Sequence, residues 1–230
     1  MQSVCNGTSR SFAPLTDRRF VCATSKGVSI PFLLRSYPPV RESPDLYHNA
    51  KIWEAGRATS AASSFFEPIA IGSLGQEFLD GGTGANNPVR QLWNEAADTF
   101  CGGSSRKLSE NLRTIVSIGT GIPDLTDFGD DLLAIGKTIL DISTETQTTA
   151  NEFHRTNSDL DDEGKYYRFN VARGLAAIGL EEASEAKRIK ELTDAYLTEQ
   201  STYSSIRKCA KTLGDSIVSA PSASSQSMFM

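Results

Sequence analysis

The sequence predicts an α/β fold in which a layered sheet is flanked by helices. Short apolar runs typical of buried strands alternate along the chain with helical segments. These runs are nearly continuous in apolar residues, as in strands covered on both faces. Several of them end directly at glycine-rich turns, where folds of this class bind ligands. We therefore examined the strand ends for functional residues.

The predicted strands are short and bounded by turn residues. The clearest covers residues 112–118 and ends at Gly119-Thr120-Gly121. The others cover residues 20–24, 30–37, 76–79 and 166–171, and Pro38-Pro39 ends the second of these. We expect helices over residues 46–62, 89–100, 130–157, 182–196 and 203–213. Pro88 marks the start of the second helix, because proline is favoured in a first helical turn.

Length and composition limit the domain organisation. A chain of 230 residues with 39% hydrophobic residues predicts one folded domain. We expect an irregular lead-in over residues 1–18, a domain over residues 19–214, and a disordered Ser/Ala-rich tail over residues 215–230.

Charge and hydropathy exclude several functional classes. The 23 basic residues are outnumbered by 28 acidic ones and form no long cluster, which argues against a nucleic-acid partner. No apolar run is long enough to span a bilayer. The helix predicted at residues 182–196 carries mixed charge, so we expect peripheral membrane contact at most. The oligomeric state is not readable from the sequence.

Cysteine and histidine usage argues against a disulfide framework, a metal site or a cofactor. The four cysteines have no CxxC spacing, and His48 and His154 lie far from them in sequence. The first residues lack the apolar stretch of a secretory signal. We expect reduced thiols in a cytoplasmic protein, with no metal and no cofactor.

The turn that begins at Asp80 is the most informative segment. A carboxylate leaves a strand here and is followed by Gly81 and Gly82, then by Asn86-Asn87 before a helix. Glycines at such a place admit positive φ and leave room for a substrate or a second side chain. Asp-Gly is also a common dipeptide of plain β-turns, so an ordinary turn is the alternative.

Two other chemical signatures are incomplete. Gly119-Thr120-Gly121 resembles part of a dinucleotide fingerprint, but position 124 is Asp, so we expect a tight turn instead. No serine has the nucleophile-elbow pattern G-x-S-x-G. Both histidines are expected on the surface. If Asp80 acts chemically, a direct Ser–Asp pair suits this sequence better than a triad.

Several segments together resemble the patatin-like phospholipase family, and most closely its fungal members. They run in the family's order from about residue 20 to about residue 196: FVCAT at 20, IWEAGRATSAA at 52, FLDGG at 78, NNP at 86, VSIGTG at 116 and YYRFNV at 166. The resemblance covers the C-terminal part of the family's domain. The Arg-Ala-Thr-Ser-Ala-Ala stretch followed by Asp-Gly-Gly is its most specific feature.

The resemblance implies a lipid acyl hydrolase with a Ser–Asp dyad, acting on ester bonds of phospholipids or acylglycerols. Only the general base carries over, onto Asp80, with Gly81 and Gly82 completing its motif. The family's nucleophile and its glycine-rich oxyanion loop have no counterpart, so we expect an incomplete fold lacking the N-terminal nucleophile half.

We therefore predict that the chain is inactive alone. Two other interpretations stay open: a non-catalytic remnant that binds a lipid or a partner, and a working hydrolase with an unrecognised nucleophile.

Overall fold

The computed structural model describes residues 18–62, 65–122, 133–172, 174, 175, 178, 183–218 and 228–229. The chain folds into two compact units. The first is Met1–Thr99 with Ser224–Met230, and the second is Phe100–Ala223. The predicted lead-in and most of the predicted tail lie outside the described residues. The domain boundaries at residues 19 and 214 stay a prediction.

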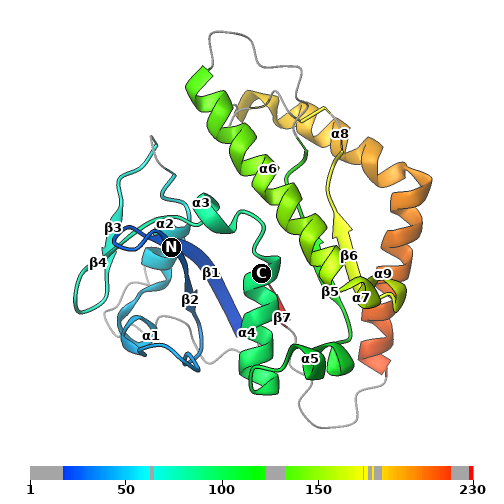
Figure 1. Ribbon diagram of the computed structural model, residues 1–230. Helices are drawn as coiled ribbons and strands as arrows, with labels where there is room; N and C mark the ends of the chain where they lie inside the picture. The colour runs from blue at the N-terminus through cyan, green and yellow to red at the C-terminus, as the bar shows by residue number, and fades with distance from the viewer. Residues whose placement is uncertain are drawn as a thin grey trace. The chain divides into compact units, whose positions relative to one another are not determined.

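The first unit contains a sheet with the strand order β2-β1-β4-β3 (Figure 1). The strands are β1 (Arg18–Ser25), β2 (Ile30–Arg35), β3 (Ile69–Ile71) and β4 (Gln76–Asp80). These neighbours are antiparallel, and the short strand β7 (Met228–Phe229) pairs parallel with β1. The strands predicted at 20–24, 30–37 and 76–79 are confirmed. Strand β3 was not predicted, because three residues are too few to show a periodic pattern.

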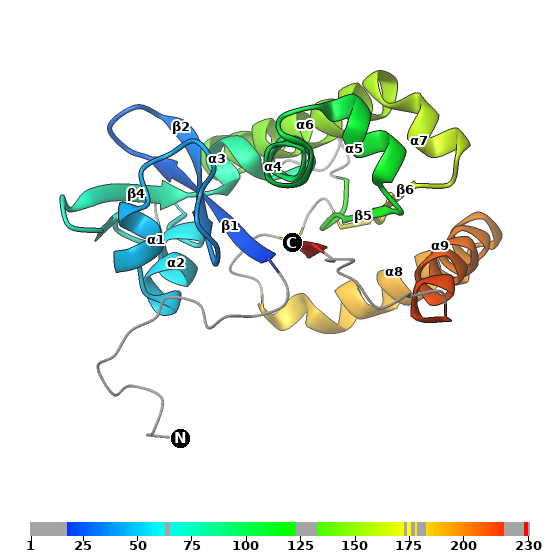
Figure 2. The same cartoon turned by 90° about the horizontal axis from the view of Figure 1, so that it is seen from below.

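Helices cover this sheet on both faces. Figure 2 shows α1 (Asp45–Asn49) and α2 (Ile52–Thr59) on one face and α4 (Val89–Cys101) on the other side, after the short α3 (Gly82–Ala85). The helix predicted at 46–62 is wrong as a single element, because Ala50 and Lys51 are extended with ψ of 137° and 155°. The Glu54 carboxylate accepts a hydrogen bond from the Lys51 N–H at 2.7 Å and so caps a separate second helix.

The hydrophobic core of this unit lies between the sheet and the helices α1 and α2. Phe78 of the central strand β4 is fully buried and contacts the ring of Phe32 at 5.6 Å between centroids. Ala55 and Ala58 are the buried residues of α2, and their small side chains let the helix approach the strands closely. The other buried members of the core are Ala23, Leu34, Leu46, Ala50 and Ile71.

The opposite face of β2 carries a buried ion-pair network. Because side chains alternate along a strand, Leu34 enters the core while Arg35 points toward α4. The Arg35 guanidinium donates to both oxygens of Glu95 at 2.7 and 2.8 Å and to both oxygens of Glu42 at 2.8 and 3.1 Å. Burial alone would lower the pKa of Arg35, but the hydrogen bonds and charges of Glu95 and Glu42 raise it overall.

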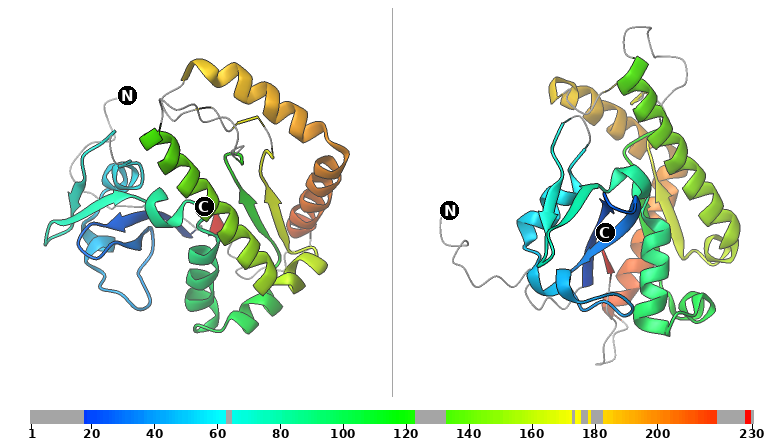
Figure 3. Two further views of the ribbon diagram at one scale, coloured as in Figure 1. Left: turned by 45° about the horizontal axis from the view of Figure 1, so that its top comes forward. Right: turned by 60° about the vertical axis from the view of Figure 1, so that its left-hand side comes forward.

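The second unit is built around two parallel strands, β5 (Ile115–Ile118) and β6 (Tyr166–Phe169), which pair Ile115 with Tyr166. Figure 2 shows these strands between α6 (Leu133–Thr156) and the helices α8 (Ala186–Thr198) and α9 (Gln200–Val218). Figure 3 shows α6 running beside the strands. Phe153 of α6 contacts the ring of Tyr166 at 5.2 Å between centroids. Three shorter helices complete the unit: α5 (Ser105–Asn111), α7 (Ser158–Asp162) and η2 (Ala183–Glu185).

The predictions for this unit are confirmed at the level of its long elements. The strands at 112–118 and 166–171 and the helices at 182–196 and 203–213 all occur, although α9 extends further at both ends. Most of the helix predicted at 130–157 is present as α6, and residues 130–132 lie outside the described residues. Both units therefore combine helices with strands, as the predicted α/β class requires. Within the described residues, no helix has the length and apolar character needed to cross a bilayer.

Candidate active site

Asp80 is the last residue of β4, a central strand that pairs with β1 on one side and β3 on the other. Its backbone is fixed by two hydrogen bonds. The Asp80 N–H donates to the carbonyl of Ala61 at 3.1 Å, and the Asp80 carbonyl accepts from the Thr24 hydroxyl at 2.8 Å. The sheet therefore holds this residue rigidly at the strand end, as predicted.

The Asp80 carboxylate is half-buried and oriented by its own turn. Its Oδ1 atom accepts a hydrogen bond from the Gly82 N–H at 3.0 Å, two residues along the chain. In the part of the chain that the structure describes, no hydroxyl donates to this carboxylate. One oxygen is therefore anchored, while Oδ2 keeps its capacity to accept a proton or hydrogen bond.

Gly81 meets a steric requirement rather than a need for positive φ. Gly81 has an α-helical backbone with φ of −65°, and neither glycine has positive φ, so that part of the sequence interpretation is wrong. A Cβ on Gly81 would lie 2.2 Å from the carbonyl oxygen of Cys22. The turn can approach β1 only because this side chain is absent, which confirms the predicted need for close approach at Gly81.

Asn87 belongs to the connection between this turn and α4. It is 4% exposed, and its Oδ1 atom accepts a hydrogen bond from the Val89 N–H at 3.4 Å. Val89 is the first residue of α4, so the Asn87 side chain bonds to the backbone two residues further on, as asparagine does in turns that lead into a helix. Asn86 is exposed beside it. The Asn-Asn-Pro stretch therefore has a structural role in starting α4.

A different Ser–Asp pair occurs elsewhere in the first unit. The Ser73 hydroxyl donates to Asp45 Oδ1 at 2.7 Å, and the Ser73 N–H donates to Asp45 Oδ2 at 3.2 Å. These bonds lower the pKa of Asp45, the Ser73 hydroxyl bond contributing most. Both atoms of Ser73 are used to fasten the β3–β4 turn to α1, which is a structural arrangement. A fluorophosphonate probe, which labels activated serines, would react with Ser73 if this pair were catalytic.

The remaining sequence candidates lie on other elements than the Asp80 turn, and each has its own local contacts. Both histidines are exposed, as predicted, and His154 Nε2 lies 3.2 Å from Asp161 Oδ2 in a surface pair. The Gly119-Thr120-Gly121 segment follows β5, and the Gly121 N–H donates to Asn170 Oδ1 at 2.7 Å. The Gly119 N–H donates to the Phe169 carbonyl and the Ile122 N–H to the Val171 carbonyl, so this segment continues alongside the chain that follows β6, and the tight turn expected from the sequence is not formed.

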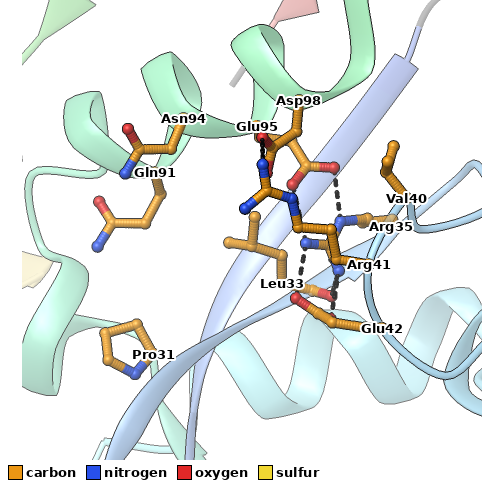
Figure 4. Close-up of a pocket in the computed structure, with 10 residues that line it drawn as sticks. All are labelled: Pro31, Leu33, Arg35, Val40, Arg41, Glu42, Gln91, Asn94, Glu95 and Asp98. Atoms are coloured by element: carbon orange, nitrogen blue, oxygen red, sulfur yellow. Dashed lines mark hydrogen bonds and ion pairs between the residues drawn. The ribbon is translucent and has the colours of Figure 1, made fainter. Parts of the chain in front are cut away.

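A polar cavity of about 240 Å³ lies between β2, the loop after it and α4 (Figure 4). The Arg35 network and a surface pair of Arg41 with Asp98 at 2.7 Å line it. Asp80 is not among its lining residues. Sequence reasoning missed this network, since Arg35 and Glu95 are 60 positions apart and no motif links them. The cavity lining combines two arginines and three carboxylates with uncharged residues, which are Pro31, Leu33, Val40, Gln91 and Asn94.

The buried thiols of Cys22 and Cys209 are unsuited to nucleophilic chemistry, because burial raises the pKa of both. Cys22, Cys101 and Cys209 are free thiols, and burial raises the pKa of Cys22 to about 11 despite the nearby Arg35 charge. A thiol that stays protonated is a poor nucleophile. Within the described residues, no three side chains of the metal-binding types gather.

Comparison with known proteins shows which family the segment around Asp80 is similar to. Residues 8–93 match the family described as patatin-like phospholipase, and this match contains the Asp80-Gly81-Gly82 turn. It begins inside the segment predicted as a lead-in. The chain is also 31% identical over 207 residues to "Patatin-like phospholipase 1" of Plasmodium falciparum (isolate NF54). That alignment covers 81% of this chain and 30% of the relative, so the chain spans about a third of the relative's length.

These two matches show that the chain resembles patatin-like phospholipases, and that the Asp80 turn lies within the segment that matches the family.

Proposed function

We propose that Asp80 is the general base of a patatin-like lipid acyl hydrolase. In this reaction a serine hydroxyl attacks the carbonyl carbon of a phospholipid or acylglycerol ester, and Asp80 accepts the serine proton. The alcohol leaves, and water then hydrolyses the acyl-serine. The observation that carries the proposal is the Asp80 carboxylate itself, held by Gly82 at Oδ1 and open to accept at Oδ2, inside the segment that matches the family.

We propose further that the nucleophilic serine lies outside these 230 residues. The chain contains no G-x-S-x-G pattern, and no hydroxyl in the described residues donates to the Asp80 carboxylate. Thr24 is near, but its hydroxyl is already donated to the Asp80 backbone carbonyl. On this proposal the chain supplies the C-terminal, base-bearing part of the family's domain, is of the fungal type, and is inactive by itself.

A reducing cytoplasmic location is part of the same proposal. The three described cysteines are free, and Cys22 is buried as an uncharged thiol, which suits a compartment that keeps thiols reduced.

The first experiment tests where the nucleophile lies. The purified chain is treated with a fluorophosphonate probe, which labels activated serines, and is assayed with phospholipid and acylglycerol esters. We expect neither labelling nor hydrolysis. Labelling that disappears with Ser73→Ala would instead identify the Ser73–Asp45 pair as a working site. Labelling of any serine in the chain contradicts an external nucleophile.

The second experiment tests the base in the full-length protein, expressed from the natural transcript. Asp80→Asn keeps the size of the side chain but removes the proton acceptor, and should lower ester hydrolysis by roughly 10²–10⁴-fold. Glu77→Gln is the matched control, because Glu77 is an exposed carboxylate on the same strand and pairs with Lys26 at 3.0 Å on the surface. Equal activity of the two variants would show that Asp80 is not the base. If the full-length protein expressed from the natural transcript does not hydrolyse lipid esters, the non-catalytic binding alternative is favoured.

A further inference from the structure

The cavity between β2 and α4 has a lining of mixed character (Figure 4). Pro31 and Leu33 of β2 and Val40 of the following loop supply its apolar part. Arginines and carboxylates supply its charged part, and the amide side chains of Gln91 and Asn94 lie to one side of these charges. Its volume of about 240 Å³ is below the roughly 300–1,000 Å³ of pockets for drug-sized ligands, so it suits a ligand of a few non-hydrogen atoms.

The arginine at the base of this cavity is fully committed to partners within the protein. Every N–H donor of the Arg35 guanidinium has an acceptor: two bonds go to Glu95, two to Glu42 and one to the Leu33 carbonyl at 3.1 Å. Arg18 lies over the ring of a neighbouring tyrosine and does not line the cavity. An anionic ligand would therefore have to displace a carboxylate of the protein to reach Arg35.

The carboxylates of the cavity exceed its cations. Three carboxylates line it beside two arginines, so the lining carries one surplus negative charge. The Glu95 side chain is 8% exposed, whereas those of Glu42 and Asp98 are 41% and 25% exposed. Arg41 pairs with Asp98 through Oδ1, and Asp98 Oδ2 accepts no hydrogen bond within the described residues. Acceptor capacity and surplus charge therefore lie on groups that a ligand can reach.

Gln91 adds an acceptor that the protein leaves without a donor. Its Oε1 atom is buried and has no hydrogen-bond partner among the described residues. Burying an acceptor without a donor is unfavourable, and the terminal torsion of a glutamine amide is broad. The amide can therefore turn toward a donor that enters the cavity that Gln91 lines.

We propose that this cavity binds a small organic ammonium ion, such as a primary alkylamine in its charged form. An ammonium group brings several N–H donors and a positive charge, which match the free acceptor capacity of Glu42, Asp98 and Gln91 and offset the surplus negative charge. The alkyl part lies against Leu33 and Val40. A carboxylate or phosphate ligand would instead add to the surplus negative charge and meet no unpaired cation.

Titration of the purified chain with n-butylammonium, followed by NMR, tests the proposal. Because so small a ligand makes few contacts, we expect a dissociation constant of about 1 mM. n-Butanol has nearly the same size without the charge and should bind about tenfold more weakly. Butyrate reverses the charge and should not bind. The backbone signals that shift with n-butylammonium should belong to residues that line the cavity.

Two substitutions within one ion pair give opposite expectations. Asp98→Asn leaves the positive charge of Arg41 uncompensated in the cavity and should weaken binding about tenfold, whereas Arg41→Gln frees Asp98 and should strengthen it about threefold. Gln91→Leu removes an acceptor and should weaken binding about threefold. Glu77→Gln is the control, because it removes an exposed carboxylate that does not line the cavity, and binding should be unaltered.

Opposite signs distinguish a binding site from damage to the fold, which would lower the affinity in every variant. Circular dichroism of each variant checks that the fold is retained. Three results would overturn the proposal: no shifts with n-butylammonium well above the expected dissociation constant, equal binding of n-butanol or butyrate, or a change of the same sign in Asp98→Asn and Arg41→Gln.

The proposal does not depend on the hydrolase function, because Asp80 does not line the cavity. Asp80→Asn should therefore bind n-butylammonium as the unchanged chain does, and the failure of either proposal can be recognised without the other.

Discussion

The backbone carbonyl of Cys22 lies where a side chain on Gly81 would have to be. A Cβ atom added to Gly81 would be 2.2 Å from that oxygen and 3.3 Å from the Cys22 Cβ. The turn carrying the proposed base is therefore pressed against β1, and the glycine after the aspartate is required by this contact.

Gly81→Ala should destabilise the first unit by roughly 1–3 kcal/mol or more, because backbone atoms have to move to admit the methyl group. Gly82→Ala is the matched control, since its Cβ would lie 3.5 Å from Asp80 Oδ2 in ordinary contact. Thermal unfolding followed by circular dichroism measures both. Similar melting temperatures for the two variants would contradict the close approach of Gly81 to Cys22.

Glu95→Gln should be far more damaging than Asp98→Asn, although both remove a carboxylate on α4 that pairs with an arginine. The side chains of Arg35 and Glu95 are 7% and 8% exposed, so the change weakens the pairing of a buried cation and should cost about 3 kcal/mol. Arg41 is 69% exposed beside Asp98, and that pair should contribute less than about 1 kcal/mol. Urea unfolding of the two variants gives the comparison. Equal losses would show that burial of the Arg35 network adds nothing.

Alkaline pH should destabilise the protein through Cys22. Burial raises the pKa of this thiol in the folded state from 9.0 to about 11, so the unfolded chain loses its proton first. The stabilising effect is fully present below pH 9, and roughly 2–3 kcal/mol is lost as the pH rises toward 11. Cys22→Ala should unfold with a smaller dependence on pH across this range. An unchanged pH dependence in that variant would exclude Cys22 as the cause.

Acid titration should reveal the Ser73–Asp45 contact. Hydrogen bonds from the Ser73 hydroxyl, the Ser73 N–H and Asn49 favour the charged carboxylate and lower the pKa of Asp45. The contribution of this contact to stability is therefore present above the ordinary aspartate pKa and is lost as the pH falls through the lowered value. NMR titration of the Asp45 carboxyl carbon should show its pKa rising in Ser73→Ala. A pKa that does not move would mean that the Ser73 hydroxyl does not favour the charged form.

Several features could be predicted because they depend on residues close together in the chain. The apolar runs at β1, β2, β5 and β6 indicated strands, and Asp80 followed by two glycines indicated a turn after β4. Short elements such as β3 and α5 carry too little periodicity to be recognised. The two-residue break at Ala50-Lys51 was also missed, because an alanine-rich stretch reads as one continuous helix.

The site depends on contacts that no local pattern contains. The order of residues around position 80 was sufficient to indicate Asp80 as a candidate base, because the Asp-Gly-Gly motif is contiguous in the sequence. A strand followed by glycines also restricts where the Asp80 carboxylate can lie. Folding alone brought Cys22 against Gly81, Glu95 against Arg35, and Arg57 beneath Phe66. These pairs are far apart along the chain or separated by a turn, and they meet only when strands pair and helices pack. The strand directions and the need for a glycine at position 81 are consequences of that packing.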